Sequence, residues 1–449
     1  MAVRLGLYMN ARRVIEGTDD LNGNAVTNVE QLAGLRNAGR LGRVDVLIRM
    51  SRDLAEHRRQ SDDGLDSEIQ PMWKGVREFT LDEIQGARLT RNVGRVPRGA
   101  TTQMLTAPAL ASFLRALRKG GDPATTTLVL WGHADGPSGV LFAHRPGIAM
   151  PPRVGRRPAA PAGSAPAPMP RPRRTVPTPA NRLPISVLSN HLARDILSPA
   201  DAQRAFAGID AQTGKLGLVC FDACQAACIE FAALLAPHAE LLIASQTPVP
   251  GAGWNYGSWP ALLSGMSKSK RRERALAIAA DFAKSAGRNL SISVTDLSKV
   301  PAIIKALKPV SEALLASPSL RAEFRKVRAR VPTPDDDAGG TVDLIGLFAA
   351  AGATLRTRDA TFARRCDVVA DSARRAIASA HRSADIAKRV PLAGLSIYCP
   401  TAKSGLGDLW DDITDTIYFE NPDQLRAFKA SRWHEFLAED RRDRDEAER

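Results

Sequence analysis

Short and almost continuous apolar runs recur along the chain and alternate with segments of helical periodicity. The runs lie at 3–9, 44–50, 127–132, 216–221, 241–245, 291–296 and 394–399. Between them, stretches such as 107–120 and 228–237 repeat their apolar residues with the period of a helix. Strands without polar alternation are typical of a sheet covered on both faces, and alternation with helices is typical of parallel strands. We therefore predict an α/β fold, with a mostly parallel central sheet between two helical layers.

Two segments interrupt this alternation. Residues 145–184 hold twelve of the thirty prolines and eight arginines but no acidic residue. Proline fixes φ and removes a backbone donor, so we predict an exposed, disordered linker there. Residues 299–390 are rich in alanine, arginine and leucine and carry no strand pattern, which predicts a helical insertion. The expected organisation is a core in two parts, 1–144 and 185–298, divided by the linker and followed by the insertion and by a last strand with a helical extension, 391–449.

The charge and the cysteine content limit the class of protein. Removing the eight linker arginines from the net charge of +14 leaves +6, and no nucleic-acid-recognition motif accompanies this charge. No run reaches the roughly 20 apolar residues that a membrane helix needs, and the first residues lack the pattern of a signal peptide. Five cysteines, an odd number in a long chain, agree with a reducing compartment. We expect a cytoplasmic protein without a membrane or nucleic-acid partner.

Three of the cysteines fall within the stretch VCFDACQAACIE, at residues 219–230. Their spacing of four is not that of a structural zinc site, no fourth ligand is near, and a C-x-x-C redox pair is absent. The pattern predicts Cys220 inside a strand, Cys224 at its carboxyl end and Cys228 one turn into the following helix. We expect no metal here, and buried packing roles for Cys220 and Cys228.

Cys224 shares its position at a strand end with a histidine. The run TLVLWGHADG leads an apolar strand into His133, and functional groups of open α/β sheets collect just beyond such strand ends. A cysteine and a histidine on neighbouring strand ends can act as nucleophile and general base. A helix beginning near Cys224 would stabilise the thiolate, and the N–H groups of Ala134 and Cys224 could receive an oxyanion. The alternative is a buried thiol and an unrelated loop histidine.

Five motifs in this order resemble the clostripain family of caspase-like cysteine peptidases. They are LVLWGHADG, FDACQAACIEFAALL, LLIASQTPVPGAGWNYGSW, SISVTDLSKV and GLSIYCP. The resemblance covers most of the chain outside 145–184 and parts of the helical region. It implies a caspase-like fold, an endopeptidase activity that needs no cofactor, His133 as base and Cys224 as nucleophile. Ala134 stands where relatives have a glycine.

The resemblance also implies a specificity. Similar family members cleave after arginine or lysine and use acidic groups in the S1 pocket. Asp222 matches the aspartate of their D-A-C motif, and residues two apart on an extended strand share a face, so its carboxylate could pair with a P1 guanidinium beside the nucleophile. The alternative role of Asp222 is that of a helix N-cap. Gln246, Trp254 and Tyr256 are also expected to bind substrate, with plain packing as the alternative for the two aromatic residues.

Relatives are made as zymogens that cut themselves between the histidine and the cysteine, and residues 145–184 lie in that interval. Because proline after arginine often blocks cleavage, Arg174, which Thr175 follows, is the predicted autocleavage site. The alternative is that the linker is an uncleaved tether. Without an export signal, we expect activation by calcium, a small molecule or a partner protein, in a stress or antiphage defence system.

The predicted function is therefore a cytoplasmic cysteine endopeptidase that acts on proteins or peptides after arginine or lysine. Two other classes stay open. One is a caspase-like binding scaffold without activity. The other is a basic nucleic-acid-associated protein, whose binding would weaken with salt and survive Cys224→Ala.

Overall fold

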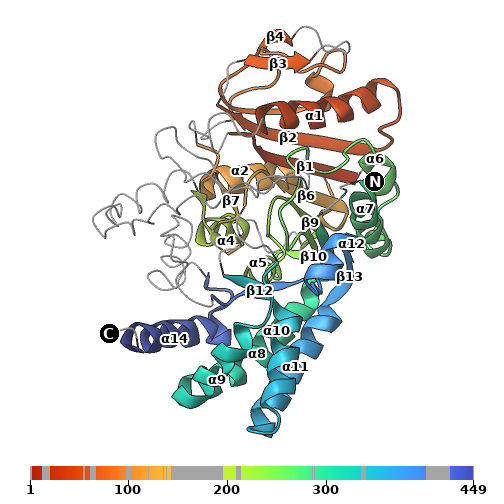
Figure 1. Cartoon of the computed structure of the whole chain (residues 1–449). Helices are drawn as coiled ribbons and strands as arrows, with labels where there is room; N and C mark the ends of the chain where they lie inside the picture. Colours follow the sequence, from red (N-terminus) through yellow and green to blue (C-terminus); the bar gives the residue numbers. More distant parts are fainter. Residues whose placement is uncertain are drawn as a thin grey trace, which may run out of the picture.

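A computed structural model gives the arrangement of the chain (Figure 1). It describes residues 3–12, 21–53, 56–60, 67–97, 103–119, 121–134, 136–137, 139–142, 196–208, 214–285, 287, 289–334, 340–400 and 425–447. The linker predicted at 145–184, together with Arg174, lies outside the described residues.

The described residues form an eight-stranded central sheet of order β13-β11-β10-β9-β6-β1-β2-β5. Its middle is parallel and consists of β10 (Ala239–Ala244), β9 (Leu216–Asp222), β6 (Thr126–Trp131), β1 (Val3–Asn10) and β2 (Val44–Arg52). Antiparallel strands close the edges: β11 (Ser291–Asp296) and β13 (Ile377–Arg382) on one side, and β5 (Gly75–Thr80) on the other. The prediction of a mostly parallel α/β sheet is confirmed.

Helices cover both faces of this sheet (Figure 1). One face carries α1 (Leu21–Asn37), α6 (Trp259–Leu263) and α7 (Arg271–Ser285), and the other carries α2 (Ala107–Arg118), α4 (Pro199–Ala207) and α5 (Ile229–Leu235). Side chains along β9 alternate between the two cores: Leu218 and Cys220 pack toward α1 and α7, whereas Val219 and Phe221 pack toward α2 and α5. This alternation is why β9 reads as one continuous apolar run.

The region predicted as a helical insertion is mostly helical but contains strands, so that expectation was partly wrong. Its helices are α8 (Val300–Ala316), α9 (Pro318–Arg328), α10 (Leu344–Leu355), α11 (Ala360–Ala376) and α12 (Ala384–Arg389). The described part of this region also contains β13, at the sheet edge, and β12 (Thr341–Asp343). The sequence of β13, IASAHR, is half-exposed and lacks an apolar run, and β12 has three residues, so neither carries a strand pattern.

The strand expected at 394–399 also differs from the prediction. It is formed as β14 (Ser396–Tyr398), but it pairs antiparallel with β12 and does not join the central sheet. Four short strands had no sequence signal: the hairpin of β3 (Glu56–Gln60) and β4 (Ser67–Pro71), and the pair of β7 (Leu141–Phe142) with β8 (Ile196–Leu197).

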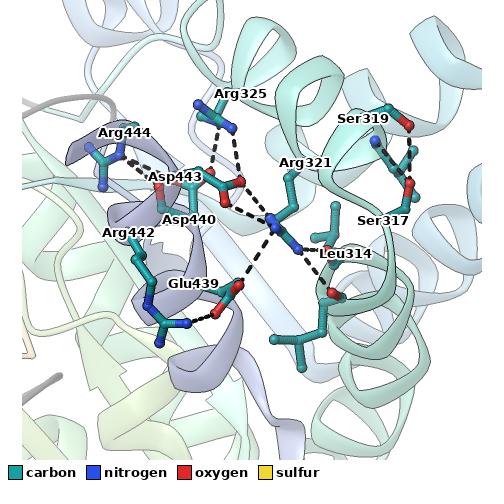
Figure 2. A network of polar contacts seen from close by, with 12 residues as sticks. Leu314, Ser317, Ser319, Arg321, Arg325, Glu439, Asp440, Arg442, Asp443 and Arg444 are labelled. Atoms are coloured by element: carbon teal, nitrogen blue, oxygen red, sulfur yellow. Dashed lines mark hydrogen bonds and ion pairs between the residues drawn. The ribbon is translucent and has the colours of Figure 1, made fainter. Parts of the chain in front are cut away.

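The C-terminal helix α14 (Trp433–Ala447) is held against α8 and α9 by a network of arginines and carboxylates (Figure 2). Arg321 donates to both carboxylate oxygens of Asp443 (2.8 and 3.0 Å) and also to the Leu314 carbonyl at the end of α8 (2.9 Å). Arg325 forms ion pairs with Asp440 (2.9 Å) and Asp443 (3.2 Å). The helix is therefore fixed by side chains that are largely shielded from water. None of the described helices has the length and apolar character required to cross a membrane.

Candidate active site

The predicted histidine and cysteine follow two neighbouring parallel strands at the same edge of the sheet. The register of β6 and β9 pairs Trp131 with Asp222, and the Gly132 N–H donates to the Asp222 carbonyl (3.2 Å). His133 and Cys224 each come two residues after this pair, and both are half-buried. The structure therefore puts them at equivalent positions on adjacent strand ends.

Glycines shape the loop that carries His133. Gly132 has φ +145°, and a Cβ there would lie 3.0 Å from the Asn10 carbonyl oxygen at the end of β1. Gly136, at φ +54°, would place a Cβ 3.9 Å from the carbonyl oxygen of Gln225, the residue after the cysteine. The loop of the histidine thus runs close to both the end of β1 and the loop of the cysteine.

The helix expected to begin near Cys224 begins later. The residue at the N-cap of α5 is Cys228, and the first helical residue is Ile229. Gln225 adopts the left-handed conformation (φ 51°), which makes a tight turn directly after Cys224 instead of a helical start. The expected stabilisation of the thiolate by this helix is therefore wrong, as is the position of Cys228 one turn into it.

Residues of the loop after β10 provide the contacts of the cysteine instead. The Val249 N–H donates to the Cys224 sulfur at 3.3 Å, and the Val249 carbonyl oxygen lies 3.9 Å from the same sulfur. The Gln225 N–H donates to the Thr247 carbonyl (3.2 Å). The turn is thus bound to the 247–249 segment at two points, the Cys224 sulfur and the Gln225 N–H.

The other two cysteines of the stretch are buried on opposite faces of the sheet. Cys220 packs in the core beneath α1 and α7, and Cys228 packs in the core beneath α2 and α5. Thiols separated by a sheet cannot share one metal ion with Cys224 between them. In the part of the chain that the structure describes, no three His, Cys, Asp or Glu side chains are grouped to hold a metal.

Asp222 is buried beneath the loop that follows β10. Its carboxylate accepts hydrogen bonds from the Trp254 N–H (3.0 Å) and the Tyr256 hydroxyl (2.8 Å), and the residue is only 3% exposed. Burial raises the pKa of Asp222 to about 7, although these two hydrogen bonds act in the opposite direction. The alternative role of Asp222 as a helix N-cap is wrong, because that place belongs to Cys228.

The loop reaches Asp222 through a glycine. Gly253 has φ +69°, and a Cβ there would lie 2.6 Å from the Asp222 carboxylate oxygen Oδ2 and 3.0 Å from the Trp131 Nε1. Only glycine leaves this approach open, because a side chain would meet both groups. The Trp254 and Tyr256 rings that follow are buried and pack with Trp259, at centroid distances of 5.6 and 5.2 Å. Both residues therefore serve as packing aromatics in this structure, as well as donors to Asp222.

Gln246 points into a buried network away from solvent. Its side-chain amide donates to Asp343 on β12 and to Ser396 on β14 (both 3.0 Å), and its oxygen accepts from the Gly394 N–H (2.7 Å). Burial raises the pKa of Asp343, while its hydrogen bonds, from the Ala393 N–H and Gln246 among others, act the other way. The geometry gives Gln246 a structural part, whereas the sequence predicted contact with substrate. The roles of Val249 and Asp343 were missed: Val249 lies within the motif at 241–259, but a motif does not show which backbone group faces the sulfur, and Asp343 lies outside every motif.

Comparisons with known proteins indicate a family and a fold for the chain. A family model described as the clostripain family matches residues 195–439, a range that includes Cys224 and begins after His133. The chain is similar to a solved secreted cysteine protease of Bacteroides thetaiotaomicron with an irreversible peptide inhibitor (13% identity, 96% of this chain and 100% of that chain, TM-score 0.51). It is also similar to an inactive zymogen protease of Parabacteroides distasonis (16% identity, 92% and 96%, TM-score 0.50). No curated protein matches the sequence. At these identities the structural likeness speaks for the fold.

Proposed function

Because the chain belongs to the clostripain family of cysteine peptidases, we propose that it is an endopeptidase whose nucleophile is Cys224 and whose general base is His133. The observation that carries this proposal is their equivalent position after the paired residues Trp131 and Asp222 on adjacent parallel strands. Side chains placed in this way meet at one edge of the sheet, where open α/β folds bind their ligands.

The proposed chemistry follows the order of a thiol peptidase. The imidazole of His133 takes the proton of the Cys224 thiol, and the sulfur attacks the peptide carbonyl carbon. The oxyanion is received by the N–H groups of Ala134 and Cys224. The Gln225 N–H takes no part, since it donates to the Thr247 carbonyl. The imidazolium then protonates the leaving amine, and water hydrolyses the acyl-enzyme.

Asp222 is the proposed determinant of cleavage after arginine or lysine. A carboxylate in a low-dielectric surrounding attracts a guanidinium strongly, and the two existing donors, which both bind Oδ2, hold the carboxylate in place. Since Asp222 is 3% exposed, a P1 side chain reaches it only when the 250–256 loop moves. In this proposal, loop opening and substrate entry are coupled.

Activation by self-cleavage at Arg174 is proposed on the resemblance to relatives, one of which was solved as an inactive zymogen. An activating signal such as calcium, a small molecule or a partner protein belongs to the same proposal, and an uncleaved tether is the alternative for the linker. Two of the similar solved proteases are described as secreted, so the cytoplasmic location and the defence role of this chain also stand as proposals.

The test is hydrolysis of fluorogenic peptides that carry arginine, lysine or aspartate at P1, with and without calcium. Wild type is compared with Cys224→Ala and His133→Ala, and each variant should lose nearly all turnover of the arginine and lysine peptides. Mass spectrometry of the same samples shows whether the chain is cut after Arg174 in wild type alone. Turnover no higher in wild type than in Cys224→Ala would contradict the peptidase proposal and favour a silent scaffold.

A further inference from the structure

We propose that the backbone N–H of Val249 is a catalytic group that stabilises the thiolate of Cys224. This inference rests on the proposed role of Cys224 as nucleophile. The N–H lies 3.3 Å from the sulfur, within the range of a hydrogen bond to sulfur, and it comes from a different strand end than the cysteine itself. It supplies the stabilisation of the thiolate that the sequence predicted from a helix N-terminus. Helix α5 does not supply this stabilisation, because its helical residues begin at Ile229.

The sequence around Val249 makes this donor both single and rigid. Val249 stands between Pro248 and Pro250, and proline has no backbone N–H. The residue before a proline is restricted to extended conformations, so Pro250 limits the backbone of Val249. Of the three residues 248–250, Val249 alone can therefore offer an amide hydrogen, and it does so in a restricted conformation.

Both ends of this segment are fixed to the fold. On one side, the Thr247 N–H donates to the Ser245 hydroxyl (3.0 Å), and the Thr247 hydroxyl accepts from the Ser291 N–H of β11 (2.9 Å). On the other side, the Gly253 N–H donates to the Pro250 carbonyl (2.8 Å) and closes a turn. The donor is thus presented by a braced loop, as a preorganised group requires.

The geometry favours the ionised form of the sulfur. In the thiol, the S–H can donate to the Val249 carbonyl, but that oxygen is 3.9 Å away, whereas the N–H is at 3.3 Å. A hydrogen bond to a charged acceptor is stronger than one to a neutral acceptor, so the N–H stabilises the thiolate more than the thiol. When His133 takes the proton, the Val249 N–H remains hydrogen-bonded to the negatively charged sulfur. Formation of the S–C bond then removes the negative charge from the sulfur.

The decisive pair of variants is Val249→Pro and Val249→Ala. Both remove the valine side chain, but only proline removes the N–H, and a run of three prolines remains extended. The rate constant for alkylation of Cys224 by iodoacetamide at neutral pH is measured by peptide mass spectrometry, which separates Cys224 from the other cysteines. We expect Val249→Pro to react about tenfold or more slowly than Val249→Ala. Equal rates, or a faster proline variant, would overturn the proposal, the latter by showing that Val249 shields the sulfur.

A second measurement tests the proposal without Val249→Pro, in case that variant does not fold. The wild type is labelled with nitrogen-15 valine, and the Val249 amide resonance is assigned by its absence from Val249→Ala. This resonance should shift with pH along the same curve as the alkylation rate, and a resonance that does not follow that curve would contradict the hydrogen bond. Failure of the peptidase proposal is seen separately, as wild-type peptide hydrolysis that equals that of Cys224→Ala.

Discussion

The hydroxyl of Tyr256 donates a hydrogen bond to the carboxylate of Asp222 at 2.8 Å, and both groups are fully buried. Burial raises the pKa of Asp222 to about 7 and raises that of Tyr256 well above its ordinary value. The phenol therefore remains a proton donor at neutral pH, while the carboxylate is the group that changes charge there. Of this pair, Asp222 alone can respond to pH in the range where the protein is assayed.

The preference for arginine at P1 should increase as the pH rises through about 7. Only the ionised carboxylate of Asp222, with its pKa of about 7, attracts a guanidinium. The measurement is the ratio of kcat/KM for a P1-arginine peptide to that for a P1-methionine peptide, because this ratio cancels the titration of the catalytic residues. Asp222→Asn should give a low ratio that does not change with pH. Tyr256→Phe removes a donor that lowers the Asp222 pKa, so its curve should move to higher pH; an unchanged curve in both variants would refute the assignment.

Substitution of Gly253 by alanine should destabilise the protein more than the same change at Gly265. The two glycines have nearly equal φ, +69° and +67°, so alanine should cause the same backbone strain, about 1–2 kcal/mol, at either position. A Cβ at Gly253 meets the Asp222 carboxylate at 2.6 Å, whereas a Cβ at Gly265 has its nearest neighbour, the end of Arg274, at 4.0 Å. We expect a further loss of about 1–3 kcal/mol for Gly253→Ala in denaturant unfolding. Equal losses at the two positions would show that the contact with Asp222 is not a constraint.

Gln246→Ala tests whether this residue supports the fold or binds substrate. The change leaves Asp343 without one donor and the Gly394 N–H without its acceptor, so we expect a loss of about 2–4 kcal/mol in the free energy of unfolding. Ser396→Ala removes one bond of the same network and should cost less. KM of the folded variant should change little. A raised KM with wild-type stability would instead restore the role in substrate binding.

Arg321→Ala should release much of the binding of α14. The Arg321 side chain is 3% exposed and bonds to both oxygens of Asp443 and to the Leu314 carbonyl; since Asp443 keeps its ion pair with Arg325, we expect a loss of about 1–3 kcal/mol. Arg442→Ala, in α14 itself, is the matched control, since Arg442 is 65% exposed and its ion pair with Glu439 is worth less than about 1 kcal/mol. Thermal unfolding of both variants, with limited proteolysis of α14, measures the difference. Similar melting temperatures would contradict the role of Arg321 seen in Figure 2.

The parts of the fold that could be predicted from sequence carry local signals. The five parallel strands are buried on both faces, so each shows an apolar run that ends at a polar or small residue. Because parallel strands run in the same direction, the residues that follow β6 and β9 lie at the same edge of the sheet, where the carboxyl ends of the strands are. The apolar runs alone therefore predict that His133 and Cys224 follow equivalent strand ends, as the structure has them.

The parts that could not be predicted depend on contacts between distant segments. The pairing of β12 with β14 joins three-residue strands that are more than fifty residues apart. Neither strand has a sequence pattern that indicates which strand it pairs with. The helix after Cys224 begins late because Gln225 takes a left-handed conformation, which is uncommon for a residue other than glycine. The donors to Asp222 come from residues more than thirty positions away, so a motif beside Cys224 could suggest the acid but not what holds it.

The position of β14 has a consequence for the order in which the chain is made. The Ser396 N–H donates to the Ala227 carbonyl in the segment after Cys224 (2.8 Å), and the Trp433 indole donates to the Tyr398 carbonyl (2.8 Å). The segment that carries the nucleophile thus receives its support from residues translated about 170 and 200 positions later. A nascent chain that already contains His133 and Cys224 still lacks this support. Translation itself therefore delays completion of the site until most of the chain has left the ribosome.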